Sequence, residues 1–130
     1  MIDNALLLLK QDLVEAPLHF DFVMGSRGSQ PATARQLTFL GDSIPDGSTW
    51  TVAGLGRHQL SMGILAIGMG GHVRVGLEDN IYYRYGELAS NEQLVSRMAR
   101  IAKEAERGVA TADEAREMLD LKTCGTTGDT

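Results

Sequence analysis

Two segments of the chain alternate apolar with polar residues, as strands with one buried face do. In residues 18–24 large apolar side chains take every second position, and residues 72–77 repeat the pattern with smaller aliphatic side chains. A third segment, residues 48–53, is rich in β-forming residues and contains Trp50. The polar positions of the two alternating segments, together with the residue that follows the second, carry ionisable groups: His19, Asp21, His72, Arg74 and Glu78. The pattern predicts three strands, of which two have a polar face bearing charge.

Helical spacing of apolar residues and capping signals predict helices around these strands. They are expected over residues 3–14, 32–40 and 58–69, from Ser90 to the residues before Gly108, and from Thr111 to Leu119. Ser90 with Gln93, and Thr111 with Glu114, form two capping boxes, and Gly108 is expected just after the end of the fourth helix. Residues 78–89, which contain three tyrosines, are predicted to form a long loop.

The alternation of strands and helices predicts a parallel sheet covered by helices. A polar inner face favours the interior of a barrel over a flat sheet, whose strands are apolar on both faces. A complete (β/α)8 barrel needs about 250 residues, and this chain has 130. The predicted fold class is therefore α/β: a partial TIM barrel in which residues 1–122 supply the last three parallel strands with their helices and a carboxyl-terminal helix. Residues 123–130 are expected to be a disordered tail. The alternative is a surface sheet whose polar face is simply hydrated.

Composition narrows the class of protein. Cys124 is the one cysteine, which excludes a disulfide framework and favours a reducing, cytoplasmic location. No apolar run approaches the roughly 20 residues of a membrane span, and the amino terminus has no secretory signal pattern. The net charge is −5, most of the acidic excess lies after Leu77, and no basic stripe suits nucleic acid. We therefore expect neither a nucleic-acid nor a membrane partner.

Three segments then support a resemblance to a known family. Residues 17–25, 47–59 and 71–80 resemble the β-keto acid cleavage enzymes, whose prototype is 3-keto-5-aminohexanoate cleavage enzyme, and residues 109–116 continue the likeness. The Glu-Asp-Asn run of residues 78–80, after a His-Val-Arg-Val-Gly strand, is its most specific part. The likeness corresponds to the carboxyl-terminal portion of the family.

The resemblance implies a zinc-dependent TIM barrel that reacts a β-keto acid with acetyl-CoA to give acetoacetate and a new acyl-CoA. It implies that Glu78 is a zinc ligand, that Asp79 is the catalytic base, and that Arg74 supports the base and binds the substrate. The family's His-x-His zinc ligands come from an earlier strand, and this chain contains no His-x-His. The chain is thus expected to lack the amino-terminal half of the barrel, to hold zinc poorly and to be inactive alone.

Each of these residues also has a purely structural interpretation. Glu78 suits a salt bridge at the rim of the barrel, and Arg74 suits a buried ion pair with Asp21 or Glu78. Asp79 suits a helix or turn cap. His19 and Asp21 suit hydrogen bonding in the barrel interior more than metal binding.

Two loops are candidates for the nucleotide end of CoA. Gly54 and Gly56 follow the second strand, where backbone N–H groups can approach a phosphate, and Arg27 adds positive charge to a turn-rich loop after the first strand. Ordinary tight turns explain the same residues.

Two other functions compete with the enzyme. One is a CoA- or dinucleotide-binding α/β module without catalysis, although Gln59 stands where a dinucleotide fingerprint has its third glycine. The other is a structural half-barrel. In each case three strands leave unpaired edges, so we expect a homo-oligomer or dependence on the missing half of the barrel.

Overall fold

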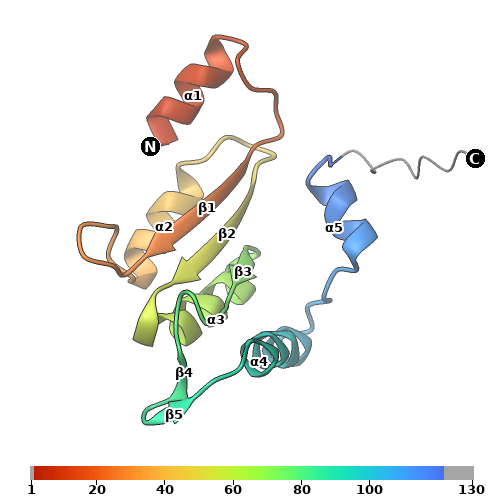
Figure 1. The fold of residues 1–130 in the computed structure, drawn as a ribbon. Coiled ribbons are helices and arrows are strands. Elements are labelled where there is room, and N and C mark those ends of the chain that lie inside the picture. Colours follow the sequence, from red (N-terminus) through yellow and green to blue (C-terminus); the bar gives the residue numbers. More distant parts are fainter. Residues whose placement is uncertain (1, 122–130) are drawn as a thin grey trace, which may run out of the picture.

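A parallel three-stranded sheet organises the computed structural model, which describes residues 2–121 (Figure 1). Its strands are β1 (His19–Met24), β2 (Thr49–Gly54) and β3 (His72–Arg74), in the order β1-β2-β3. His19 pairs with Thr49 across β1 and β2, and Thr51 pairs with His72 across β2 and β3. The three predicted strands and their parallel arrangement are confirmed. The tail predicted over residues 123–130, including Cys124, lies outside the described residues.

The described residues form five α-helices and one short 3-10 helix. They are α1 (Ile2–Lys10), α2 (Ala34–Asp42), η1 (Gly56–His58), α3 (Gln59–Met69), α4 (Asn91–Glu104) and α5 (Ala112–Met118). Both predicted capping boxes are present, at Ser90 before α4 and at Thr111 before α5. In α5 no residue is buried, and Figure 1 shows this helix standing away from the sheet.

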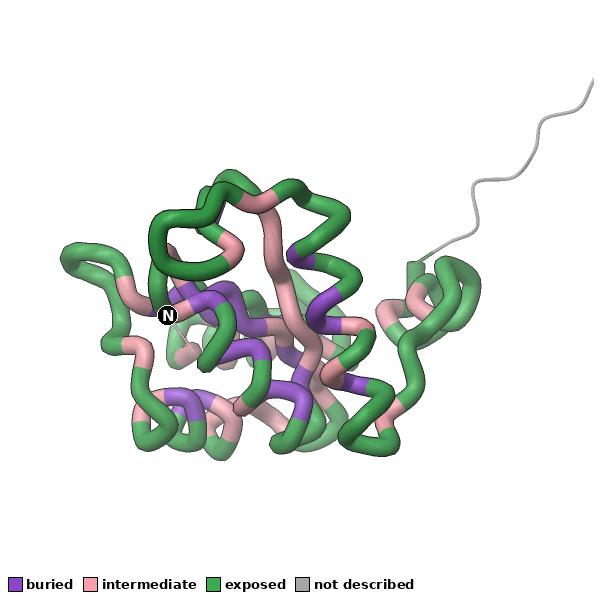
Figure 2. Tube along the Cα trace, turned by 90° about the horizontal axis from the view of Figure 1, so that it is seen from below, coloured by how far each residue is buried: buried purple, intermediate pink, exposed green. Residues whose placement is uncertain are grey.

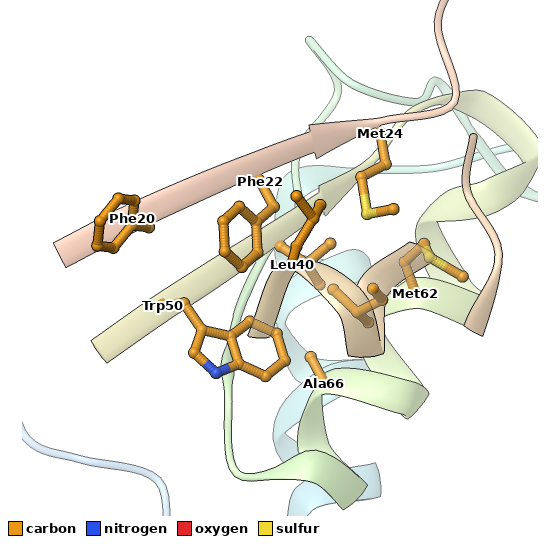
Figure 3. Packing of buried hydrophobic residues seen from close by; sticks show 9 residues of the cluster. Phe20, Phe22, Met24, Leu40, Trp50, Met62 and Ala66 are labelled. Carbon is orange, nitrogen blue, oxygen red and sulfur yellow. The ribbon is translucent and has the colours of Figure 1, made fainter. Parts of the chain in front are cut away.

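One face of the sheet is apolar and lies against helices. Buried Phe20, Phe22 and Met24 of β1 join Trp50 and Val52 of β2. The same cluster contains residues of α2 and α3, namely Leu37, Leu40, Met62 and Ala66 (Figure 3). Figure 2 shows the buried positions gathered along the strands and the helices beside them. The alternation along the strands therefore fixes which side chains face the helices.

The opposite face of the sheet is polar. His19 and Asp21 of β1 are exposed there, and Arg74 of β3 is partly buried. A parallel sheet with helices against one face and ionisable groups on the other is consistent with part of an α/β barrel. No helix among the described residues is long and apolar enough to cross a membrane.

The strand predicted over residues 72–77 ends early, at Arg74. The N–H groups of Asp79 and Asn80 donate to the carbonyl of Gly76, so the chain turns where the alternating pattern would have continued as strand. Glu78 consequently lies in a turn and not on the face of a strand. The loop predicted over residues 78–89 was also wrong in part, because it contains a hairpin of β4 (Tyr82–Arg84) and β5 (Glu87–Leu88). Gly86, with a φ of 75°, permits its tight turn.

Two predicted helix ends were displaced. α1 stops at Lys10 because Asp12 adopts a left-handed φ of 54° and the Leu13 N–H returns to the Leu8 carbonyl. After α4 the left-handed position is occupied by Glu106, with a φ of 57°, and not by Gly108. In both cases a non-glycine residue takes the conformation that glycine usually supplies.

Candidate functional site

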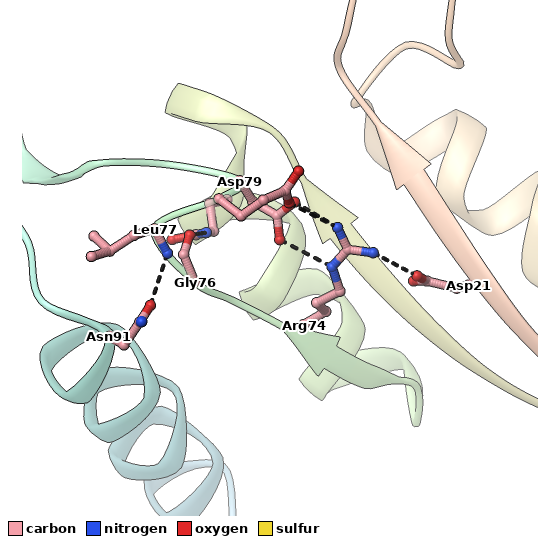
Figure 4. A network of polar contacts seen from close by, with 8 residues as sticks. Asp21, Arg74, Gly76, Leu77, Asp79 and Asn91 are labelled. Atoms are coloured by element: carbon pink, nitrogen blue, oxygen red, sulfur yellow. Dashed lines mark hydrogen bonds and ion pairs between the residues drawn. The ribbon is translucent and has the colours of Figure 1, made fainter.

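Arg74 is the centre of a cluster of charged side chains at the carboxyl end of β3 (Figure 4). Its Nε donates to Asp79 Oδ2 at 3.1 Å, and its Nη2 donates to Asp79 Oδ1 at 2.7 Å. This is a two-pronged, charge-assisted contact of the kind that a planar guanidinium makes and an ammonium cannot reproduce. The Asp79 side chain is only 3% exposed, so Arg74 is the charge that compensates a carboxylate removed from water.

Two more carboxylates reach the same guanidinium from its exposed side. Arg74 Nη1 donates to Asp21 Oδ2 at 2.9 Å, and Nη2 donates to Glu78 Oε2 at 3.2 Å. The Glu78 side chain is 84% exposed, whereas Arg74 and Asp21 are each 40% exposed. The ion pairs considered for Arg74 from the sequence are therefore both present, and the contact with Asp79 is additional.

These contacts keep Arg74 charged. Its hydrogen bond with Asp79 raises the pKa of the guanidinium, burial opposes this, and the contact with Asp21 raises the pKa further. Three carboxylates surround one cation, so the cluster has an excess of negative charge. A buried carboxylate with a fixed orientation, Asp79, thus lies beside a cation that also faces solvent.

The turn that carries Glu78 and Asp79 is fixed by β2 and α4. The Gly56 N–H, just after β2, donates to the Asp79 carbonyl at 2.8 Å. Asn91, the first residue of α4, accepts the Leu77 N–H on its Oδ1 at 2.8 Å. Both contacts hold the backbone of the turn, so the position of the Asp79 side chain depends on residues distant in the sequence.

Gln59 and Asn80 hold the turn from the side of α3. Gln59 is 1% exposed, and its Nε2 donates to the Gly76 carbonyl at 3.1 Å. Asn80 Nδ2 donates to Gln59 Oε1 at 3.4 Å and to the Tyr82 carbonyl at 2.6 Å. Sequence reasoning missed this role of Gln59, Asn80 and Asn91. A long polar side chain at the first position of a helix that is otherwise mostly apolar was the available signal for Gln59.

A zinc site needs several donor side chains close together. Glu78 offers an exposed carboxylate, one oxygen of which accepts from Arg74. Within residues 2–121 no group of three or more His, Cys, Asp or Glu side chains could hold a metal ion. These residues therefore do not make a zinc site by themselves, and Glu78 can be one ligand of a site completed from elsewhere.

Two histidines, His19 and His72, lie near each other on the polar face of the sheet. The two ring nitrogens of His19 lie 2.8 Å from Thr49 Oγ1 and 3.0 Å from Thr51 Oγ1. His72 lies 6.1 Å from His19 between ring centroids. Burial, then the charges of Arg107 and His19, lower the pKa of His72. His19 thus makes hydrogen bonds on the exposed polar face of the sheet, and its place in a barrel interior stays a prediction.

The glycine loop after β2 has a structural explanation. A Cβ on Gly54 would lie 2.4 Å from the His58 carbonyl oxygen, so only glycine fits there. The Leu55 and Gly56 N–H groups donate to the carbonyls of Met24 and Asp79. Arg27 is exposed in the loop after β1 and is not part of the Arg74 cluster. The assignment of Arg27, Gly54 and Gly56 to a CoA nucleotide stays a prediction.

A cavity of about 790 Å³ lies beside the same turn, and we call it the Tyr–Arg pocket. It is lined chiefly by aromatic and cationic side chains from η1, the β4-β5 hairpin and α4: Arg57, Tyr82, Tyr83, Arg84, Tyr85 and Arg97. Gly56 and Asn80 also line it. Because Asn80 follows Asp79 in the chain and Gly56 binds the Asp79 carbonyl, the pocket and the Arg74 cluster share one turn.

Comparison with known proteins finds several relatives similar to nearly all of this chain. The 3-keto-5-aminohexanoate cleavage enzyme of Fusobacterium nucleatum subsp. nucleatum is 58% identical over 123 residues, which cover 94% of this chain and 44% of the relative. The enzyme of the same name from Acetoanaerobium sticklandii is 51% identical, over 93% of this chain and 45% of the relative. The 3-oxoadipate:acetyl-CoA acetyltransferase of Cupriavidus necator is 40% identical, over 93% and 44%.

The chain thus spans less than half the length of the curated relatives it matches. Residues 1–121 also match the family described as beta-keto acid cleavage enzyme. Nearly the whole chain is covered by that match, including the three strands, the Arg74 cluster and the hairpin that follows it. This chain belongs to the β-keto acid cleavage enzyme family.

Proposed function

We propose that this chain is the carboxyl-terminal part of a zinc-dependent enzyme that reacts a β-keto acid with acetyl-CoA, giving acetoacetate and a new acyl-CoA. The observation that carries the proposal is the Asp79 carboxylate, which is almost fully buried and is held by two N–H groups of Arg74. It lies at the carboxyl end of a parallel sheet, on the face opposite the helices. This is where α/β barrels assemble their catalytic groups.

Asp79 and Arg74 have complementary roles in the proposal. Asp79 takes a proton from the acidic carbon of the β-keto acid, between its keto and carboxylate groups. Arg74 uses Nε and Nη2 to fix the orientation of Asp79. Its Nη1, which faces the half-exposed Asp21, is the donor best placed to bind the substrate carboxylate by exchanging that partner.

Glu78 contributes one zinc ligand in the proposal, and the other ligands come from outside this chain. Zinc bound there would supply a Lewis acid able to polarise a keto oxygen. Because residues 2–121 contain no complete ligand set, we assign no step of the reaction to the metal. We include acetyl-CoA as a substrate because the name of the Cupriavidus necator relative contains it.

Completion of the sheet is also part of the proposal. Within the described residues β1 and β3 each form a strand ladder only with β2, so both outer edges have free backbone groups. Further strands, from the rest of the protein or from a second copy, are expected to pair with them. The binding-module alternative has less support, because Gly54 is explained by its approach to the His58 carbonyl.

A chimeric enzyme tests the proposal. This chain would replace the matching segment of the Fusobacterium nucleatum relative, and acetoacetate formation from 3-keto-5-aminohexanoate and acetyl-CoA would be measured. We expect the chimera to be active. We expect Asp79→Asn to lower kcat about 100-fold or more, the range for losing a general base.

Asp113→Asn is the matched control, because Asp113 is a 95% exposed carboxylate on α5 whose ion pair is with Arg116. This substitution also removes one negative charge, but at a position distant in the sequence from the Arg74 cluster, and it should leave activity unchanged. A folded chimera that makes no acetoacetate, or an Asp79→Asn chimera with full activity, would overturn the proposal.

A further inference from the structure

The Tyr–Arg pocket has features that the proposed chemistry at Asp79 does not use. Its volume, about 790 Å³, is in the range of pockets that enclose a small molecule. It is lined by three arginines, and no acidic residue is among its lining residues. Arg84 shares its charge with Glu87 across the hairpin turn, at 3.1 Å, and both side chains are more than half exposed. The pocket is therefore strongly cationic.

Arg97 gives the clearest sign that an anion belongs there. The residue is only 7% exposed, and its Nε is buried without a hydrogen-bond partner among the described residues. Its Nη1 donates to the Tyr83 carbonyl at 2.6 Å, and its guanidinium lies 4.3 Å from the centre of the Tyr83 ring. None of the ion pairs in the described part of the chain includes Arg97. A buried guanidinium without a carboxylate leaves positive charge that an anion in the adjoining pocket would compensate.

The tyrosines indicate that the anion carries a flat ring. Tyr83 already has a guanidinium on its face, from Arg97, with Arg84 at 5.4 Å from its centre. Tyr82 is 48% exposed and Tyr85 is fully exposed, so both rings are open to a ligand. Aromatic and guanidinium planes stack on nucleobases, while arginines bind phosphate through paired N–H groups. A phosphorylated nucleoside combines both requirements.

We propose that the Tyr–Arg pocket binds the phosphorylated adenosine end of CoA. This rests on the proposed function, in which acetyl-CoA is a substrate. The base stacks on the exposed tyrosines, and Arg57, Arg84 and Arg97 bind phosphate groups. Gly56 and Asn80 line the pocket and also hold the turn of Asp79, so the nucleotide site and the Arg74 cluster share that turn. The site for the nucleotide is then the hairpin and α4, in place of the loop of Arg27.

Binding to the full 130-residue chain tests the assignment directly. Isothermal titration would use CoA, adenosine 3′,5′-bisphosphate and inorganic phosphate as separate probes. We expect CoA and the bisphosphate to bind with similar affinity, and inorganic phosphate to bind at least about tenfold more weakly, because it lacks the ring. Affinity for the bisphosphate should fall with added salt.

Exposed arginines allow variants that keep the fold. Arg57 and Arg84 are both exposed, so the double variant Arg57→Gln, Arg84→Gln is expected to fold, which circular dichroism would check. It should bind the bisphosphate at least about tenfold more weakly through loss of charge-assisted contacts. Arg35→Gln, an exposed arginine on α2 outside the pocket, is the control and should bind unchanged. In the chimera the double variant should raise KM for acetyl-CoA by a similar factor and leave kcat unchanged.

The two proposals fail separately. If neither CoA nor the bisphosphate binds, or if both bind the double variant as tightly as the original chain, the pocket is not the nucleotide site. An active chimera would then leave the proposed function intact. If the bisphosphate binds and requires Arg57 and Arg84 while the folded chimera makes no acetoacetate, the pocket stands as a nucleotide site and the proposed reaction falls.

Discussion

Replacing Arg74 by methionine removes the only cation in contact with the buried Asp79 carboxylate within the described residues. Arg74→Met keeps the long aliphatic stem and deletes the two N–H groups that donate to Asp79 at 3.1 and 2.7 Å. The carboxylate, 3% exposed, then loses its charged partner and stays largely out of water. The substitution therefore isolates the energetic role of the guanidinium.

The expected magnitude follows from burial. Breaking a buried ion pair by deleting one partner costs roughly 3–5 kcal/mol. We expect about 3 kcal/mol, the lower end, because Arg74 is itself 40% exposed and solvent screens part of the interaction. Arg74→Lys keeps the charge but cannot donate two parallel bonds, so about 1–2 kcal/mol is expected. Asp21→Asn affects a half-exposed pair and should cost about 0–1 kcal/mol.

Urea unfolding followed by the fluorescence of Trp50, which lies in the core, measures these differences. With a slope of about 2 kcal/mol per molar urea, 3 kcal/mol lowers the midpoint by about 1.5 M. The order of midpoints should be the original chain, then Asp21→Asn, then Arg74→Lys, then Arg74→Met. Equal shifts for Asp21→Asn and Arg74→Met would refute the reasoning, because they would mean that Asp79 does not depend on Arg74.

Three other outcomes are expected. Gly71→Ala places a Cβ about 2.3 Å from ring carbons of Trp50 and should lower the free energy of unfolding, measured in urea, by about 1–3 kcal/mol. Gly68→Ala is the control: its Cβ would meet no atom within 4 Å, so this variant should be as stable as the original chain or more stable. Burial, followed by the charge of Arg107, lowers the pKa of His72 below 6.5, so on acidification the unfolded chain binds the proton before the folded chain does. The free energy of unfolding should therefore fall as the pH drops below about 6.5. His72→Gln should flatten this dependence of stability on pH, and an unchanged dependence would contradict the role given to His72. Sedimentation of the chain alone should show oligomers, since β1 and β3 have open edges, and a stable monomer with a sharp unfolding transition would contradict this.

Local patterns in the sequence predicted the elements well. The alternation in β1 is strict, and its burial alternates in the same way, so the apolar face could be read directly. The capping boxes at Ser90 and Thr111 involve residues three positions apart, and both formed. Signals that act over three or four residues are available to sequence reasoning because their geometry is fixed by the helix or strand itself.

The site was less predictable because its contacts are distant in the sequence. Residues 74, 78 and 79 came from the family resemblance, but the partners that hold their turn did not. Asn91 caps the Leu77 N–H from the start of α4, and Gln59 reaches the Gly76 carbonyl from α3. The alternating pattern also continued past Arg74, although the strand did not, because the turn around Gly76 is stabilised by these non-local bonds. The spacing of apolar residues along the chain gives no signal for these hydrogen bonds.

The meeting of Arg74 with Asp21 follows from strand order and from one small residue. The two side chains come from β3 and β1, which are separated by β2 and so by about 10 Å of sheet. Ala53 of β2 pairs with Arg74 and lies on the same polar face. It is fully buried there, although it points away from the helices. A short side chain at this position leaves the space across which the guanidinium reaches the first strand. The polar face therefore brings charged side chains from non-adjacent strands into contact, because its edges carry long polar side chains and its centre carries a small one.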